Sequence, residues 1–369
     1  MNTVHLEPST AHADGHGSGR PALNPRAGTL PLIPSPLATG GANSDGIMLP
    51  PAITADESIQ KMLRCPNCRG RLVRHEGKLD CDDPNCQMQF PVVDGIPVLI
   101  NDHKSLFTRA DFVSKRNTTF DLARGSMIRQ LDRWLPTLSR NFAAGRNYRA
   151  FARSVLKQSP QPVVLVIGGG ILGRGMEALA AHPQIRLVET DVSFGPRTQV
   201  ICDAHDLPFA DSSFDGVVTQ GVLQYVVAPS RCLRELERVL KPHGIVYAES
   251  AFMQQVVHGR YDFFRFTHLG LRRLFRRFEE VDSGPVGGPG MALAWSCQFF
   301  LLSFATTRWV RRGIYAFTRL TLFWLKYVDA LLLKKPGTYD AASGFFFMGQ
   351  KRGTILPDQE LVARYRGAQ

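Results

Sequence analysis

The 369-residue sequence lacks the marks of a secreted or membrane-spanning protein. Its first fifteen residues contain no basic stretch followed by an apolar one, so a secretory leader is not expected. Seven cysteines are an odd number, and four of them cluster, which is unlike a secreted disulfide scaffold. The uncharged apolar run 291–307 is only marginal in length for a membrane span. The expected location is therefore the reducing cytoplasm, with peripheral attachment to a membrane as an open alternative.

Acidic residues are too few to balance the basic ones, because 32 Asp and Glu face 44 Lys and Arg, a net charge of +12. Most of the excess lies in two segments, +8 over 101–160 (12 − 4) and +6 over 291–335 (7 − 1). A basic balance is typical of proteins that bind nucleic acid or an anionic membrane, although a solubilising face gives the same count. With 44% hydrophobic and 21% charged residues, the chain can bury a sizeable core.

Composition and periodicity divide the chain into five segments. Within the basic segment 101–160, Phe120, Met127, Leu131 and Trp134 recur at helical spacing. The first residues are rich in Pro, Gly, Ser and Ala without an apolar period, so they cannot bury enough surface to offset their chain entropy. The expected segments are a disordered tail (1–52), a cysteine-bearing module (60–100), a helical linker (101–160), an α/β domain (161–350) and a second tail (351–369).

From Val163 onward, apolar strands alternate with helical segments, which is typical of a doubly wound, mostly parallel α/β sheet. The stretch 291–335 predicts a helical insert before the last strand. Strands are expected at 163–167, 185–190, 199–202, 214–219, 244–250 and 345–348. Helices are expected near 172–182, 229–240 and 267–278.

Four cysteines form two close pairs with the spacing Cys65-x2-Cys68-x12-Cys81-x4-Cys86. Two such pairs fold as knuckles that present four thiolates to one ion, and Zn²⁺ favours this tetrahedral set. A closed four-thiolate site has no open position, so the zinc would be structural and would stabilise a module too small for a large core. Two disulfides, free thiols or a one-iron site are the alternatives.

The segment LRCPNCRGRLVRHEGKLDCDDPNCQMQFPVVDGIPVLI resembles the short zinc-ribbon module of methyltransferase activator proteins. That module also occurs fused ahead of methyltransferase domains. The shared features are the opening CPNC, the second cysteine pair and the closing run from Phe90 to Pro97. The resemblance implies a zinc ribbon ahead of the α/β domain.

A glycine loop follows the first expected strand. The segment VVLVIGGGILGRG places Gly168, Gly170 and Gly173 between a strand and a helix, which is the required context of a GxGxxG motif. The motif alone fits NAD, FAD and S-adenosylmethionine equally, and a packing turn also satisfies it. Asp191 ends the second strand, where a carboxylate can accept hydrogen bonds from both ribose hydroxyls.

The third strand and its continuation resemble the class I S-adenosylmethionine-dependent methyltransferases, in the type 11 grouping. The segment DAHDLPFADSSFD matches the signature D-A-x-x-L-P-F-x-D-x-S-F-D, and the match runs from Val163 to about Glu249. The resemblance implies a Rossmann-like sheet of seven strands and S-adenosylmethionine as the cofactor.

Carried over residue by residue, the resemblance also implies the contacts of that cofactor. The carboxylate of Asp203 and the N–H of Ala204 would bind the adenine, and Asp191 would bind the ribose. Gly168 and Gly170 would lie against the methionine part. Near the sulfonium and the substrate entrance it places Gln220 and Gly221.

One position departs from the pattern of this family. An acidic residue usually stands two positions before the first glycine, where it holds the loop or the amino group of the cofactor. Here that position is Val166. This replacement has three alternative consequences: the cofactor binds more weakly, another group substitutes for the acid, or the domain is degenerate and inactive.

Methyl transfer mainly requires alignment of a nucleophile behind the electrophilic methyl group, and an oxygen nucleophile also needs a general base. The candidate bases follow the fifth strand and are His258, Asp262 and His268. A structural role is the alternative, because Thr267 suits the N-cap of the next helix with His268 in its first turn.

The insert 291–335 is interpreted either as a lid over the substrate cleft or as a membrane-surface helix. If 308–326 is one helix, then Arg308, Arg312, Arg319 and Lys326 share a stripe and aromatic residues lie opposite. A packed helical subdomain has the same apolar spacing. Both interpretations favour an apolar or lipid-linked substrate.

These observations predict a methyltransferase that acts on a small-molecule or lipid-linked acceptor. One alternative is an RNA methyltransferase that grips phosphates with the zinc ribbon and the basic segment 101–160. Another is a catalytically inactive, methyltransferase-like binding module. RNA is less favoured, because the basic segments lack interleaved aromatics and the fourth strand is followed by QGVLQY rather than a base-methylating motif.

Overall fold

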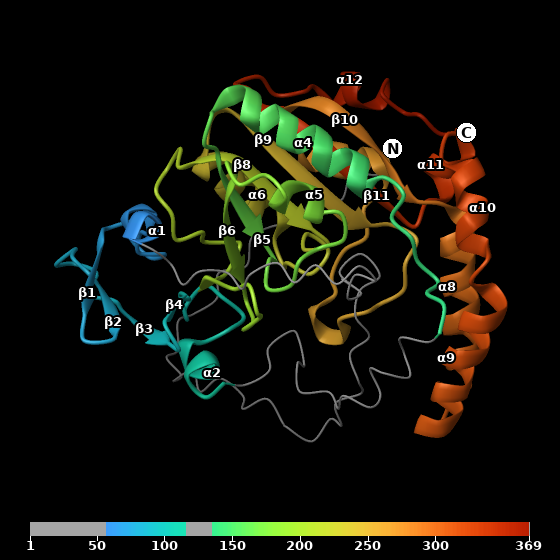
Figure 1. The fold of residues 1–369 in the computed structure, drawn as a ribbon, viewed down its shortest axis with the longest axis horizontal. Coiled ribbons are helices and arrows are strands. Elements are labelled where there is room, and N and C mark those ends of the chain that lie inside the picture. The colour runs from blue at the N-terminus through green and yellow to red at the C-terminus, as the bar shows by residue number, and fades with distance from the viewer. Residues whose placement is uncertain (1–56, 116–134, 369) are drawn as a thin grey trace, which may run out of the picture. The chain divides into compact units, whose positions relative to one another are not determined.

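The computed structural model describes residues 57–115 and 135–368 (Figure 1). The expected tail 1–52 and the residues that predicted a helix in the linker, from Phe120 to Trp134, lie outside the described residues. The strands are β1 (Leu72–His75), β2 (Lys78–Cys81), β3 (Gln89–Val93), β4 (Ile96–Leu99), β5 (Val163–Ile167), β6 (Arg186–Asp191), β7 (Val200–Cys202), β8 (Phe214–Gln220), β9 (Leu240–Ala251), β10 (Phe278–Gly287) and β11 (Gly344–Lys351). The helices are α1 (Glu57–Met62), α2 (Arg109–Val113), α4 (Ala144–Gln158), α5 (Glu177–Ala180), α6 (Pro229–Val239), α7 (His268–Leu274), α8 (Pro289–Leu302), α9 (Arg308–Leu322), α10 (Leu325–Leu332), α11 (Gly337–Ala341) and α12 (Asp358–Val362).

The strands form one mixed sheet in the order β1-β2-β3-β4-β7-β6-β5-β8-β9-β11-β10. Neighbouring strands from β4 to β9 are parallel, whereas β11 is antiparallel to both β9 and β10. The mostly parallel core predicted from the sequence is therefore confirmed. The chain order reverses between β5 and β8, and ligands of open α/β sheets bind at the carboxyl ends of the strands beside such a reversal.

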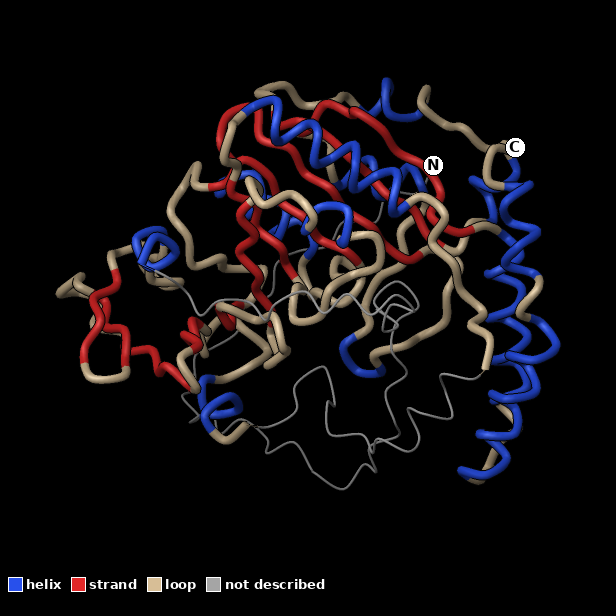
Figure 2. Tube along the Cα trace, in the orientation of Figure 1, coloured by secondary structure: helices blue, strands red, loops and turns tan. Residues whose placement is uncertain are grey.

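Helices cover both faces of the parallel strands, and Figure 2 shows α4 crossing over them. Side chains of a strand alternate between the two faces. Val164 and Val166 of β5 therefore pack with Phe151 of α4, while Leu165 and Ile167 belong to the opposite core with α6 and α7. This two-sided burial explains why β5 is an uninterrupted apolar run.

The cysteine-bearing module continues directly into the sheet of the α/β domain. Its last strand, β4, pairs in parallel with β7, with Val98 opposite Ile201 and Leu99 opposite Cys202. The hydrophobic core beneath α6 also includes Cys65 of the module. The module is thus an extra edge of the sheet, and it lies beside the strand that leads to Asp203.

Two elements differ from the sequence prediction for identifiable reasons. β10 was not expected, because charged residues, Gly284 and Pro285 interrupt any apolar alternation, and its antiparallel pairing with β11 contains two register shifts. The helix expected near 172–182 is restricted to Glu177–Ala180. Gly175, at φ +89°, prolongs the glycine loop instead.

The insert before β11 consists of α8, α9 and α10. Asp329 of α10 accepts hydrogen bonds from the N–H groups of Gly288, Gly290 and Met291 at 2.7–3.0 Å, so it caps the start of α8. In the described residues, no helix has both the length and the apolar content that crossing a membrane requires.

The single helix over 308–326 that the stripe of four cations requires is wrong, and two of these cations contact backbone carbonyls. Arg319 donates to the carbonyl of Pro136 at 2.9 Å, and Lys326 donates to the carbonyl of Thr137 at 2.6 Å. The helix is interrupted between Leu322 and Leu325, so Lys326 belongs to α10, whereas Arg319 shares α9 with Arg308 and Arg312. Backbone carbonyls of the segment before α4 bind both inward-facing cations.

Candidate functional site

The four cysteines of the module converge on one point. Their Sγ atoms all lie within 4.8 Å of one another, with 3.3 Å between Cys68 and Cys81 and 3.7 Å between Cys65 and Cys86. Tetrahedral Zn–S bonds of about 2.3 Å place sulfur atoms about 3.8 Å apart. All four cysteines are free, which argues against the disulfide alternative. The residues therefore fit a tetrahedral ion, and a fully coordinated one would be structural.

We expect about one Zn²⁺ per chain, because the four thiolates close a tetrahedral site. Elemental analysis of natively purified, chelator-washed protein measures it. The double variant Cys65→Ser, Cys81→Ser should lose the metal, whereas Cys297→Ser, at a half-buried cysteine in α8, should retain it. Wild-type protein without zinc, or equal zinc in the double variant, would contradict the assignment.

The glycine loop after β5 turns tightly against two neighbouring segments. Gly168 has φ +75°, and its N–H and that of Gly169 donate to the carbonyl of Thr190 at 2.9 Å. A Cβ atom on Gly168 would lie 2.4 Å from Cγ2 of Val222. Only glycine therefore fits this position, and the backbone is left open to a ligand.

Asp191 ends β6 beneath this loop. Its Oδ2 accepts from the N–H of Gly170 at 3.0 Å, and a Cβ on Gly170 would lie 2.8 Å from the same oxygen. Burial raises the pKa of Asp191 to about 6, although backbone N–H groups of Gly170, Val192 and Ser193 act to lower it. The loop and the carboxylate are thus fixed to one another.

Gln220, at the end of β8, presents an acceptor beside the loop. Its Nε2 donates to the carbonyl of Arg174 at 3.2 Å and to Oε2 of Glu249 at 2.9 Å, which turns Oε1 the other way. This Oε1 is buried and has no hydrogen-bond partner in the described part of the chain. A Cβ on Gly173 would lie 1.8 Å from it, so glycine is required where the acceptor stands. Such an orphan buried acceptor costs free energy unless a ligand satisfies it.

Glu249 supplies a buried carboxylate behind this amide. The Nδ2 group of Asn141 donates to both of its oxygens at 2.9–3.1 Å, and the hydroxyl of Tyr247 donates to Oε1 at 2.5 Å. Burial raises the pKa of Glu249, and these donors lower it. Since every neighbour donates, the ionised form satisfies all the bonds. Glu249 lies at the expected end of the family resemblance, but nothing in the sequence indicates that Asn141 contacts it.

A pocket opens between the glycine loop and the end of β8. Its walls are Val166, Ile167, Gly168, Ile171, Gly173, Met176 and Gln220. Gln220 is thus the polar side chain among apolar walls, and Gly221, at φ +68°, begins the next turn. Of the residues predicted to bind the cofactor, Gly168, Gly173 and Gln220 come together in this pocket, whereas Gly170 is not among its walls.

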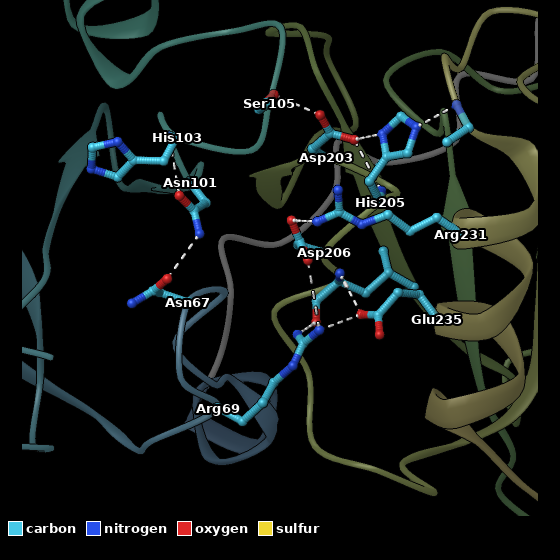
Figure 3. Close-up of polar contacts among 12 residues, drawn as sticks. Asn67, Arg69, Asn101, His103, Ser105, Asp203, His205, Asp206, Arg231 and Glu235 are labelled. Carbon is cyan, nitrogen blue, oxygen red and sulfur yellow. Dashed lines mark hydrogen bonds and ion pairs between the residues drawn. The ribbon is translucent and has the colours of Figure 1, made fainter. Parts of the chain in front are cut away.

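Asp203 and Ala204 follow β7 at the same edge of the sheet, and both are buried. His205 Nε2 accepts from the N–H of Ala228 at 3.0 Å, so Nδ1 carries the hydrogen and donates to Oδ1 of Asp203 at 2.5 Å (Figure 3). The hydroxyl of Ser105 donates to Oδ2 at 2.5 Å. Burial acts to raise the pKa of Asp203, but the bonds from His205 and Ser105 hold it below its ordinary value.

The three candidate bases occupy different surroundings. Asp262 accepts from the N–H of Val257 at 2.8 Å and forms an ion pair with Arg265. His268 Nε2 lies 2.9 Å from the Ser283 hydroxyl, in the first turn of α7, and burial lowers its pKa to about 4.

His258 contacts the turn that follows Gln220. Its ring is 4.2 Å from that of Tyr225, in the turn after Gln220. Burial lowers the pKa of His258, which keeps the ring neutral near pH 7. A neutral imidazole can accept a proton, so His258 has the state that a general base needs.

Residues 165–248 form a class I S-adenosylmethionine-dependent methyltransferase domain. The family model described as "Methyltransferase domain" matches residues 165–248, which confirms the resemblance. The zinc-ribbon resemblance agrees with the four-cysteine cluster, which is consistent with a zinc-binding module.

The chain is similar to two curated proteins over parts of their length. It is 28% identical over 123 residues to the ubiquinone/menaquinone biosynthesis C-methyltransferase UbiE of Geotalea daltonii, covering 29% of this chain and 52% of that protein. It is 40% identical over 75 residues to the demethylmenaquinone methyltransferase of Clavibacter sepedonicus, covering 20% and 26%. The chain thus spans about half of the first relative and a quarter of the second.

Similar solved structures include two methyltransferases. One is phosphoethanolamine N-methyltransferase 2 of Haemonchus contortus, with TM-score 0.36, 16% identity, and coverage of 63% of this chain and 61% of that one. The other is the 1,6-didemethyltoxoflavin-N1-methyltransferase of Burkholderia thailandensis, with TM-score 0.35, 18% identity, and coverage of 72% and 96%.

Proposed function

We propose that the whole protein transfers a methyl group from S-adenosylmethionine to an apolar, lipid-linked aromatic acceptor. The observation that carries the cofactor half is the buried, unpartnered Oε1 of Gln220 against the glycine cradle. The names of the curated relatives, which refer to ubiquinone, menaquinone and demethylmenaquinone, support the acceptor class.

In this proposal, Gln220 and Glu249 together take the role of the acidic residue that the family has at the position of Val166. Oε1 of Gln220 accepts from the ammonium of the cofactor's methionine part, and the carboxylate of Glu249 behind the amide supplies the compensating charge. Asp191 binds the ribose, and Asp203 with Ala204 binds the adenine. The cofactor, when bound, supplies an electrophilic methyl group.

The remaining residues prepare the acceptor. His258 takes the proton that the acceptor's hydroxyl or ring loses as its bond to the methyl group forms. The segment after β9 exposes Met253, Val256, Phe263 and Phe264, which is an apolar surface at the same edge of the sheet. Val257 and Trp295 of α8 pack in one hydrophobic cluster, so the insert borders this surface.

We also propose that the insert contacts a membrane surface that delivers the acceptor. Phe304 is 70% exposed and Trp309 is 77% exposed, which is unusual for large apolar side chains. Arg308 and Arg312 are exposed beside them, and the guanidinium of Arg312 lies 5.0 Å from the ring centroid of Trp309. Aromatic residues next to cations suit the interface of an anionic bilayer.

The proposed activity is tested by incubating the protein with methyl-labelled S-adenosylmethionine and a demethylated, prenylated quinol in detergent. Label should enter the organic phase and be lost in His258→Gln, while cofactor affinity is unchanged. Structured RNA serves as the competing acceptor in a parallel reaction. Transfer to RNA alone, or no transfer in either, would overturn the proposed acceptor class.

Cofactor affinity should fall as the pH is lowered through about 6. Asp191 is ionised above that value and accepts from ribose hydroxyls, whereas its protonated form has less acceptor capacity. Calorimetric titration with S-adenosylhomocysteine between pH 5 and 7.5 measures the effect. The raised pKa of Glu249 acts in the same direction, so Asp191→Asn isolates the share of Asp191. An identical pH profile in wild type and Asp191→Asn would contradict the ribose assignment.

A further inference from the structure

The segment that leaves the zinc module runs directly to the predicted adenine site. Because β4 is parallel to β7, both strands end at the same edge of the sheet, just before Asn101 and Asp203. The hydroxyl of Ser105 then donates to Oδ2 of Asp203 at 2.5 Å (Figure 3). A carboxylate at the predicted adenine site is thus oriented by a residue outside the matched methyltransferase domain.

Hydrogen bonds connect this segment back to the cysteine cluster. Asn67, between Cys65 and Cys68, donates through Nδ2 to the sulfur of Cys86 at 3.4 Å. Its Oδ1 accepts from Nδ2 of Asn101 at 3.2 Å, and Asn101 is 2% exposed. The carbonyl of Asn101 accepts from the N–H of Ser105 at 3.0 Å, which closes the turn that carries the hydroxyl.

A second set of contacts fixes the module to the loop after Asp203. Arg69 donates to the carbonyl of Leu207 at 2.6 Å and pairs with Glu235 of α6 at 2.8 Å. Glu235 also accepts from the N–H of Leu207 at 2.8 Å. Leu63 forms an antiparallel bridge with Phe209. The module therefore contacts the chain before Asp203, where β4 pairs with β7, and after Asp203, at Leu207 and Phe209.

Apolar side chains of the same segment build a wall at this edge. Phe107 and Phe112 belong to one buried cluster with Ile201 of β7. Val192 and Phe194, directly after Asp191, pack against this cluster. The wall thus joins the segment after the module to the ends of both β6 and β7, between which the adenine is expected.

We propose that Ser105 is a positioning residue for adenine recognition, and that the zinc-bound module holds it in place through Asn67 and Asn101. This inference rests on the proposed cofactor. Asp203 has room for it, because two carboxylate oxygens offer about four acceptor positions. Oδ1 accepts from both the backbone N–H and Nδ1 of His205, and Oδ2 accepts from Ser105, so one acceptor position on Oδ2 remains for the 6-amino group of adenine. The zinc module is then a permanent part of the cofactor site.

The test compares S-adenosylhomocysteine with S-inosylhomocysteine, whose base has a carbonyl in place of the 6-amino donor. Isothermal calorimetry on the full-length, zinc-loaded chain gives both affinities. Wild type should prefer the adenosyl ligand, and Ser105→Ala should reduce that preference roughly fivefold to tenfold. Ser105→Thr, which keeps the hydroxyl, should restore it. Ser114→Ala removes a hydroxyl of the same segment that bonds only to α2 carbonyls, so it should change nothing.

The link to the metal is tested with Asn67→Ala and with chelation. Each should reduce the adenine preference of wild type, and neither should reduce it further in Ser105→Ala, because the two changes act through one contact. Thermal unfolding of each protein measures stability alongside. A loss that is equal for both ligands would mean a structural role only and would overturn the inference. Unchanged selectivity in Ser105→Ala would also overturn the inference, but the proposed cofactor would stand. If the wild type binds neither ligand, the proposed function itself is refuted.

Discussion

A Gln220→Met variant should bind S-adenosylhomocysteine roughly 10- to 100-fold more weakly than the wild type, as expected for the loss of a hydrogen bond to a charged group. Methionine keeps the length of the side chain but removes the acceptor that faces Gly173 and the pocket. The carboxylate of Glu249 remains, so the loss reports the contact with the cofactor's ammonium. Isothermal calorimetry measures it directly.

The control for this variant is a ligand without the amino group. The deaminated analogue of S-adenosylhomocysteine should bind wild type and Gln220→Met with equal affinity, because it has no donor for Oε1. Gln298→Met is the matched protein control: Gln298 is also buried and donates to Thr318 at 2.7 Å, but in the insert. Equal losses for both ligands would show that Gln220 only supports the fold.

This site illustrates which parts of a binding site follow from sequence. The glycines and Asp191 could be predicted because a fixed spacing after a strand dictates their place in the turn. The proposed replacement for the missing acid could not be predicted, because Gln220 and Glu249 lie on two different strands and meet only when β8 and β9 pair. Asn141, which completes the set, acts from the start of α4.

The fold shows the same division between local and long-range information. β5 and its neighbours were predictable because burial on both faces leaves an apolar run. β10 was not, because its strand conformation comes from pairing with β11, which follows the whole insert. The pairing of β4 with β7 is also long-range, and the local sequence of the cysteine-bearing module does not predict it.

In the insert, the observed contacts differ from the expected stripe of four cations. This difference decides which cations an experiment on membrane binding should replace. Arg319 and Lys326 serve backbone carbonyls of Leu135, Pro136 and Thr137, so they are unavailable to a lipid surface. The cations that remain beside the exposed aromatics are those at the start of α9, namely Arg308, Arg311 and Arg312.

Replacing Arg308, Arg311 and Arg312 together by glutamine should weaken binding to anionic vesicles by about two decades, because each cation near such a surface contributes about 1 kcal/mol. Co-sedimentation with phosphatidylserine-containing vesicles measures this, and raised salt should reduce wild-type binding in parallel. The control is Arg319→Gln with Lys326→Gln, which removes the inward-facing pair. This double variant should lower the melting temperature and leave vesicle binding unchanged. The triple variant should weaken vesicle binding and leave the melting temperature unchanged. If the insert is only a packed lid, wild type will not sediment with vesicles at all, and the triple variant will behave as the wild type does.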